Sequence, residues 1–197
     1  MFFSSSFDKL IEQFSLLPGV GRKTAQRFAF YILKLSNEEV NKFVDSLKNA
    51  KEKIKQCETC FNFSDENICK ICSDKTRDIS TICVVEEASD VIYFERTKNF
   101  FGLYHILGGV LSPLDNIGPN DLKVNELLNR INGETKEIIF AISPTLEGET
   151  TILYLCKLLR KYNIKISRIA RGIPIGSDLE YVDEATIANA LKERVLL

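Results

Sequence analysis

The chain has 197 residues, of which 45% are hydrophobic and 27% charged, and its formal net charge at pH 7 is −1. These values are ordinary for a globular protein of one or two compact domains. No apolar run approaches the roughly 20 residues of a membrane-spanning helix, and the N-terminus lacks the basic and apolar regions of a secretory signal. We therefore expect a cytoplasmic protein with no membrane partner and with reduced cysteines.

The near-neutral net charge hides an asymmetry along the chain. Residues 1–56 carry ten Lys or Arg against six acidic residues, an excess of four positive charges, whereas the remaining 141 residues have a net charge of −5. A basic arm on an acidic body favours a polyanionic partner for the N-terminal part. Solvated lysines on helical surfaces explain the same numbers equally well.

Residues 1–56 are predicted to form an all-α arm. Apolar residues recur at helical spacing in two runs, 10–17 and 28–35, and the sequence Pro18-Gly19-Val20-Gly21 between them must break the helix. A third helix is predicted to begin after an N-cap at Ser36 or Asn37.

The break between the first two helices carries the first functional signal. Gly19 and Gly21 predict a tight turn that opens directly onto a helix, whose free N–H groups form an anion site. Arg22, Lys23 and Arg27 add positive charge there. Because nothing in this segment reads bases, phosphate contacts would be independent of sequence. The segment resembles the helix-hairpin-helix DNA-binding motif; an ordinary turn between antiparallel helices is the alternative.

Four cysteines in residues 57–72 predict a small C4 zinc finger. Cys57 and Cys60 form one C-x-x-C pair, and Cys69 and Cys72 form the second. Two such pairs complete a tetrahedral four-sulfur site with no open coordination position, so the zinc is predicted to be structural. A redox C-x-x-C, an accidental cluster of cysteines or an iron–sulfur cluster is the alternative.

The other two cysteines, Cys83 and Cys156, lie in apolar segments and are expected to be core residues.

Residues 80–175 alternate between apolar strands and helical patterns. This alternation predicts an α/β domain with a mostly parallel sheet. The predicted strands are 81–85, 103–107, 138–142 and 166–169, and the predicted helices are 88–94, 122–131 and 150–162. Residues 176–197 are expected to form a C-terminal tail with a last helix that begins after Asp183.

Acidic residues follow two of the predicted strands. Glu86 comes directly after the first strand, and Glu147 and Glu149 follow the third. In a parallel sheet these residues lie at the carboxyl edge, where a carboxylate cluster can hold Mg²⁺. The pattern resembles the Toprim fold of topoisomerases and primases, with Glu-x-Glu in place of the usual Asp-x-Asp. A solvated acidic loop is the alternative.

Taken in order, these parts resemble the RecR family of recombination mediators. The resemblance covers essentially the whole chain and rests on PGVGRKTAQR at 18–27, the four cysteines, CVVE at 83–86, SPTLEGE at 143–149 and RIARGIPIG at 168–176. The segments LSPLD at 111–115 and LEYVD at 179–183 also fit. One departure is Arg22, where members of the family often have proline.

The resemblance implies a role in RecF-pathway DNA repair. Proteins of this family act with RecO and RecF to help load RecA onto gapped or single-stranded DNA, and they assemble into ring-like tetramers. No catalytic activity is attributed to their Toprim unit, which mainly contacts partners. Residues 172–183 resemble the Walker B-like motif of the family, but the sequence has no Walker A loop, so an ATPase is not supported.

The motifs are compatible with two functions. The first is a non-catalytic DNA-binding mediator in which the zinc finger joins the arm to the Toprim body. The second is a Mg²⁺-dependent nuclease or primase that uses Glu86, Glu147 and Glu149. Such enzymes usually place a basic or nucleophilic helper near the acids, whereas His105, the only histidine, is predicted to be a satisfied core residue inside an apolar strand. The mediator is the function that we expect.

Overall fold

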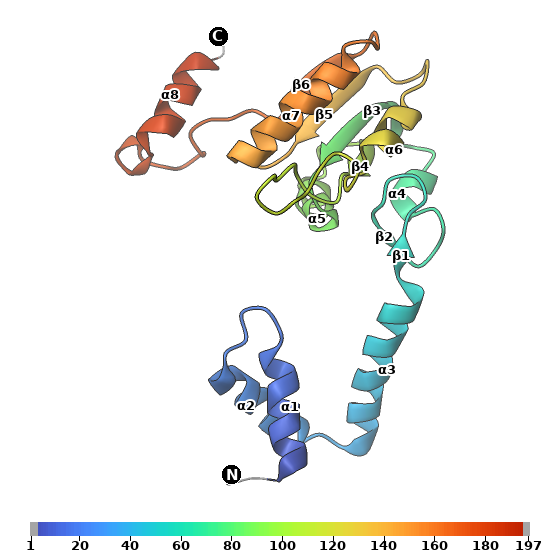
Figure 1. Ribbon diagram of the computed structural model, residues 1–197, viewed down its shortest axis with the longest axis vertical. Helices are drawn as coiled ribbons and strands as arrows, with labels where there is room; N and C mark the ends of the chain where they lie inside the picture. Colours follow the sequence, from blue (N-terminus) through green and yellow to red (C-terminus); the bar gives the residue numbers. More distant parts are fainter. Residues whose placement is uncertain (1–3, 195–197) are drawn as a thin grey trace. The chain divides into compact units, whose positions relative to one another are not determined.

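The computed structural model describes residues 4–194, and the chain divides into two compact units on either side of the bond between Ile54 and Lys55. Figure 1 shows the elements in sequence colours, from the blue N-terminal helices to the red C-terminal helix α8. No helix within the described range is long and apolar enough to cross a membrane.

The first unit is entirely helical, as predicted. Its helices are α1 (Ser5–Ser15), α2 (Arg22–Ile32) and α3 (Asn37–Lys53). α1 and α2 enclose a small core in which Phe7 and Ile11 meet Ala25 and Ala29. The two alanines are completely buried, and their small side chains let the two helices approach each other closely.

The N-terminus of α3 is fixed by a capping box. The Ser36 side chain accepts a hydrogen bond from the Glu39 amide, and the Glu39 carboxylate accepts one from the Ser36 amide. The hydrogen bond from the Ser36 amide, and second the one from the Ser36 hydroxyl to the same carboxylate, lower the pKa of Glu39. Of the two predicted N-caps, Ser36 is the one that the structure uses.

The centre of the second unit is a four-stranded parallel sheet. Its spatial order is β4-β3-β5-β6, and every neighbouring pair is parallel, which confirms the predicted α/β fold. The strands are β3 (Asp78–Val85), β4 (Gly102–Ile106), β5 (Glu137–Ala141) and β6 (Lys165–Arg168). The helices between them are α5 (Ala88–Thr97), α6 (Val124–Arg130) and α7 (Leu146–Leu159).

Alternate residues of β3 enter two different cores. Ile82 and Val84 pack in the larger core with apolar residues of α6 and α7. Cys83 and Val85 point the other way, into a core that contains Val91 of α5 and the cysteines of the finger. Because both faces are covered, the strand is apolar throughout its second half.

The finger precedes the sheet, and the C-terminal tail follows it. The finger consists of the antiparallel strands β1 (Lys55–Gln56) and β2 (Phe63–Ser64) and the short helix α4 (Lys70–Ser73). The tail contains a 3-10 turn η1 (Leu179–Tyr181) and α8 (Glu184–Lys192), for which Asp183 is the N-cap as predicted.

Candidate functional site

The turn between α1 and α2 has the geometry that its sequence predicts. The Val20 amide donates to the Leu17 carbonyl at 3.0 Å, and Gly19 has a φ of +75°. Proline at the second position and a positive φ at the third are the signature of a type II turn. Gly21 is then the N-cap of α2, and no side chain caps the first turn.

The backbone of this turn is open to an approaching ligand. A Cβ atom at Gly19 or Gly21 would meet nothing within 4 Å. Both glycines and the side chains of Arg22, Lys23 and Arg27 are exposed. None of the ion pairs among residues 4–194 involves these three cations. The structure therefore combines uncapped helix amides with free positive charge, which is the chemistry of a phosphate site.

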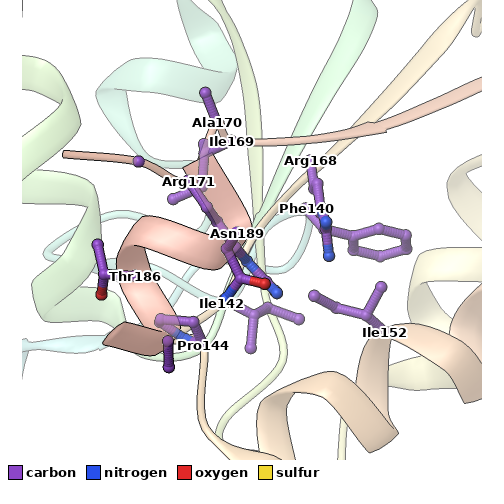
Figure 2. A pocket seen from close by; sticks show the side chains of 12 residues that line it. Phe140, Ile142, Pro144, Ile152, Arg168, Ile169, Ala170, Arg171, Thr186 and Asn189 are labelled. Atoms are coloured by element: carbon purple, nitrogen blue, oxygen red, sulfur yellow. The ribbon is translucent and has the colours of Figure 1, made fainter. Parts of the chain in front are cut away.

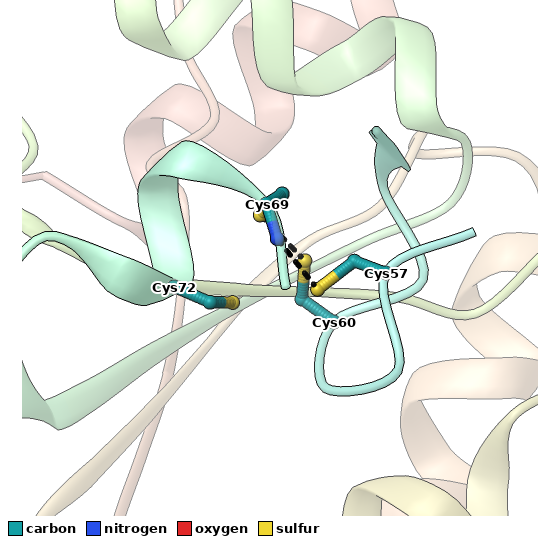
Figure 3. A group of neighbouring side chains, drawn as sticks. All are labelled: Cys57, Cys60, Cys69 and Cys72. Atoms are coloured by element: carbon teal, nitrogen blue, oxygen red, sulfur yellow. Dashed lines mark hydrogen bonds between the residues drawn. The ribbon is translucent and has the colours of Figure 1, made fainter. Parts of the chain in front are cut away.

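The four predicted zinc ligands come together in the finger, as Figure 3 shows. Their sulfur atoms all lie within 4.8 Å of one another, and the sulfurs of Cys60 and Cys69 are 3.5 Å apart. Tetrahedral zinc with Zn–S bonds of about 2.3 Å requires sulfurs separated by about 3.8 Å. The thiols are thus already arranged around one point.

Local backbone structure explains why the two C-x-x-C pairs face each other. In the first pair, the Phe61 amide donates to the Cys57 carbonyl, and Phe61 takes a φ of +67°, which turns the chain back toward β2. In the second pair, Cys69 is the N-cap of α4, and its amide donates to the Cys57 sulfur at 3.3 Å. Amide donors to sulfur favour the thiolate form that binds metal.

Without a bound cation, the close packing of these four thiols gives them unequal pKa values. Hydrogen bonding with Cys69 raises the pKa of Cys60 to about 12, and hydrogen bonding with Cys60 raises the pKa of Cys72. The pKa of Cys69 falls to about 2 because its sulfur accepts hydrogen bonds, first from Cys60 and then from Cys72. A bound Zn²⁺ lets all four ionise together, so the donor set fits a structural zinc. Cys57, Cys60 and Cys69 are buried, as a closed site requires.

The remaining cysteines and the histidine also match their predictions. Cys83 is buried in β3, and Cys156 packs at the margin of the larger core. His105 is completely buried with both ring nitrogens partnered, by the Lys123 carbonyl at 2.7 Å and by Arg130 at 3.2 Å. Burial lowers its pKa to about 3, so the ring is neutral.

The predicted acidic residues lie at the carboxyl edge of the sheet but do not converge. Glu86 follows β3, while Glu147 and Glu149 belong to the first turn of α7, which begins at Leu146 and not at Thr150 as predicted. The helix starts early because the Thr145 hydroxyl caps it, accepting from the Gly148 amide. Within residues 4–194, the cysteines are the only group of three or more His, Cys, Asp or Glu side chains close enough together to share a metal ion.

Glu149 has partners that the sequence did not indicate. It pairs with Arg171 and, at 3.5 Å, with Arg168, and Arg168 also pairs with Glu193 of the tail. The arginines follow Glu149 by 19 and 22 residues, a separation at which neither periodicity nor motif spacing reports a contact. These ion pairs fasten the tail to the start of α7.

The same arginines border a pocket of about 400 Å³, shown in Figure 2. Its apolar side comes from Phe140, Ile142 and Ile152, and α8 contributes Thr186 and Asn189. Since Arg168 and Arg171 are already neutralised by carboxylates, the pocket carries no free charge with which to select an anion. It marks the place where the tail lies against the sheet and α7.

Comparison with protein families agrees with this sequence of parts. Family models match the RecR helix-hairpin-helix (residues 7–51), the four-cysteine zinc finger domain of RecR (54–74), the Toprim domain (80–170) and the C-terminal region of RecR (172–195). The four models together cover nearly the whole chain.

Three relatives named "Recombination protein RecR" are similar over their full length. The protein of Chlorobium phaeobacteroides (strain BS1) is 50% identical over 200 residues, covering 98% of each chain. That of Bifidobacterium animalis subsp. lactis (strain AD011) is 48% identical over 193 residues, covering 98% of this chain and 96% of the relative. That of Chloroherpeton thalassium (strain ATCC 35110 / GB-78) is 50% identical over 198 residues, covering 97% of each chain. With its helical hairpin, its four converging cysteines, its parallel Toprim sheet and this level of identity, the chain belongs to the RecR family of recombination proteins.

Proposed function

We propose that this chain is a non-catalytic, DNA-binding mediator of recombinational repair. It acts in the cytoplasm with RecO-type and RecF-type proteins to help load RecA onto gapped or single-stranded DNA. The observation that carries the proposal is the open first turn of α2, where uncapped amides lie beside three cations that no carboxylate of residues 4–194 neutralises.

DNA phosphates are the ligand that this turn fits best. Gly19 and Gly21 let a phosphate approach the backbone, because no side chain stands over them. Arg22 and Lys23 flank the helix start, and Arg27 lies about one turn further on. Contacts of this kind bind the backbone of single- or double-stranded DNA without reading sequence, and their strength falls with salt.

Self-association into a tetrameric ring is supported by the surface of the first unit. Large apolar side chains are exposed there, and several line one groove of the unit. The groove residues are Phe14, Leu17, Phe28, Tyr31, Ile32, Leu35 and Phe43. A second copy of the chain is the partner that the family resemblance implies for such a face.

The acidic edge of the sheet is assigned to partner contact and not to catalysis. A Mg²⁺-dependent nuclease or primase needs several carboxylates on one metal, whereas Glu149 is engaged by Arg168 and Arg171. Glu86 and Glu147 remain partly exposed and are proposed to contact a RecO-type or RecF-type protein. A Mg²⁺-dependent cleavage or primer-synthesis activity that disappears in Glu86→Ala would overturn this assignment.

The DNA proposal is tested by fluorescence-anisotropy titrations of the full chain at several salt concentrations. The double variant Lys23→Ala/Arg27→Ala removes two cations beside the turn, and Lys48→Ala/Lys51→Ala removes two exposed cations of α3 as a matched control. We expect the first variant to bind DNA at least about tenfold more weakly, with a log K against log[salt] slope shallower by about 1.8 for duplex and 1.4 for single strands.

The control variant is expected to keep both the affinity and the slope of the parent. An equal loss of DNA affinity in the two variants would mean that binding depends only on the net charge of the chain. Unchanged DNA affinity in Lys23→Ala/Arg27→Ala would show that the hairpin is not part of the DNA-binding site.

A further inference from the structure

Arg130, the last residue of α6, is a partly buried cation whose acceptors are both neutral. Its guanidinium donates to the Tyr104 carbonyl at 2.6 Å and contacts Nδ1 of His105 at 3.2 Å. No carboxylate within residues 4–194 forms an ion pair with it. A guanidinium stays charged in proteins, and a desolvated charge without a counter-charge is costly.

His105 cannot supply the missing negative charge, and its tautomer is fixed. Nε2 lies 2.7 Å from the Lys123 carbonyl, which only accepts, so Nε2 carries the proton. Nδ1 therefore accepts from Arg130. The ring holds the guanidinium in place as a neutral acceptor, while its own position is set by α6 and β4.

The residues that hold Arg130 adjoin the zinc finger. The amide of Ile106, the residue after His105, donates to the Cys60 carbonyl at 2.9 Å, and the Phe61 ring lies edge-on to His105 at 5.6 Å between centroids. Burial lowers the pKa of Arg130, whereas attraction to Cys72, Cys60, Cys57 and Cys69 raises it. Arg130 is thus held by Tyr104 and His105, the two residues that precede Ile106, and the amide of Ile106 contacts the zinc knuckle, the two C-x-x-C pairs at 57–60 and 69–72.

The charge of the Arg130 guanidinium is opposite to that of the zinc site. Zn²⁺ with four thiolates carries a net charge of −2, and three of these cysteines are buried in the same core as Tyr104 and Ile106. Groups around a metal's ligands commonly change its affinity. We propose that Arg130 is a positioning residue that supplies the counter-charge of the zinc tetrathiolate and thereby couples the finger to α6 and β4.

The proposal is tested by zinc competition against a chromophoric chelator, using the full chain. Arg130→Gln removes the charge and is expected to weaken zinc binding about 10- to 100-fold. Arg130→Lys keeps the charge and is expected to recover most of that loss. Lys123→Gln is the matched control, because Lys123 lies 5.3 Å from the Phe61 ring centroid but remains solvated. We expect less than a threefold change for this control.

A second readout separates charge from packing. In the cobalt-substituted protein, loss of a nearby cation destabilises the thiolate electrons, so the sulfur-to-cobalt band should move to lower energy in Arg130→Gln and stay in place in Arg130→Lys. Zinc affinity within twofold of the parent in Arg130→Gln, an unmoved band, or an equal effect of Lys123→Gln would each overturn the proposal.

A measurement on the unmutated chain covers the case in which Arg130→Gln does not fold. Hydrogen exchange is compared before and after chelation of the zinc. Because Arg130 loses its counter-charge with the metal, residues 124–131 of the α6 region should lose protection together with residues 55–74 of the finger. Loss of protection confined to the finger would contradict the coupling.

Discussion

The backbone amide of Ile106, the last residue of β4, donates a hydrogen bond of 2.9 Å to the carbonyl oxygen of Cys60 in the zinc knuckle. β4 is an edge strand of the sheet. Exposed edge strands are templates for pairing with another chain unless something covers them. The knuckle therefore serves two purposes at once, since the residues that bind zinc also satisfy the end of the edge strand.

Removal of zinc is expected to uncover this edge and to make the protein self-associate beyond its native state. The physical reason is that the knuckle keeps its shape only while four thiolates share one cation. Light scattering at several protein concentrations, before and after addition of a chelator, measures the effect. The control is the same chelator saturated with zinc, and an absence of concentration-dependent scattering in the chelated sample would contradict the expectation.

Replacement of a zinc ligand should affect stability differently from replacement of a core cysteine. Cys57→Ala is expected to lose the metal and to lower the midpoint of thermal unfolding by roughly 10 °C or more. Loss of the zinc removes several kcal/mol of folding free energy, and each kcal/mol shifts the midpoint by about 2–4 °C in a chain of this size. Cys83→Ala removes an equally buried thiol from β3, should keep one zinc per chain, and should cost only about 1–2 kcal/mol. Metal analysis and thermal unfolding of both variants decide between the two roles.

The first turn of α7 depends on glycine at position 148. A Cβ atom there would lie 2.0 Å from the Ser143 carbonyl oxygen, which is backbone and cannot move aside easily. Gly148→Ala is therefore expected to cost more than about 2 kcal/mol in the free energy of unfolding. Gly133→Ala is the matched control, because its Cβ would meet nothing within 4 Å, and it should change stability by less than about 0.5 kcal/mol. Urea unfolding measures both, and equal effects would show that the turn is not closely packed.

The neutral His105 should make the protein sensitive to acid. Burial lowers its pKa from 6.5 to about 3, so between these values the unfolded chain binds a proton that the folded chain does not. Stability from this group is complete above pH 6.5 and falls as the pH drops toward 3, with a slope that approaches about 1.4 kcal/mol per pH unit.

The variant His105→Gln tests this pH dependence. Glutamine keeps an amide donor for the Lys123 carbonyl but does not titrate, so the variant should be less stable near neutral pH and lose less stability between about pH 6.5 and 5. The difference between the urea midpoints of parent and variant is the measurement. Because zinc loss affects both proteins in this range, a constant difference across the pH range would show that His105 does not contribute to the acid sensitivity.

Much of the fold followed from local patterns. The helices of the first unit, the turn at Gly19 and the cap at Ser36 each depend on residues within a few positions of one another. The parallel sheet also followed, because apolar strands that alternate with helices have few other ways to bury both faces. The start of α7 at Leu146 did not follow, because the cap that fixes it is a hydrogen bond from the Gly148 amide to the Thr145 hydroxyl, which the apolar pattern does not report.

The candidate sites divide in the same way. The zinc ligands were identifiable because two C-x-x-C pairs specify their chemistry by spacing alone. The pairing of Glu149 with Arg168 and Arg171, and the position of Arg130 beside the knuckle, were not identifiable, because they join segments that are adjacent only after the sheet has formed.

By itself, the sequence determined that four cysteines hold a zinc, that a glycine turn opens a helix beside three cations, and that a parallel sheet follows. These features depend on short-range geometry and on the chemistry of single residue types. Only the tertiary structure decided that the zinc knuckle closes the edge at Ile106, that the predicted acids do not share a site, and that Arg130 lies among neutral acceptors near the thiolates. Such relationships depend on which side chains are buried next to one another in the folded chain, and the spacing of residues along the sequence does not indicate this.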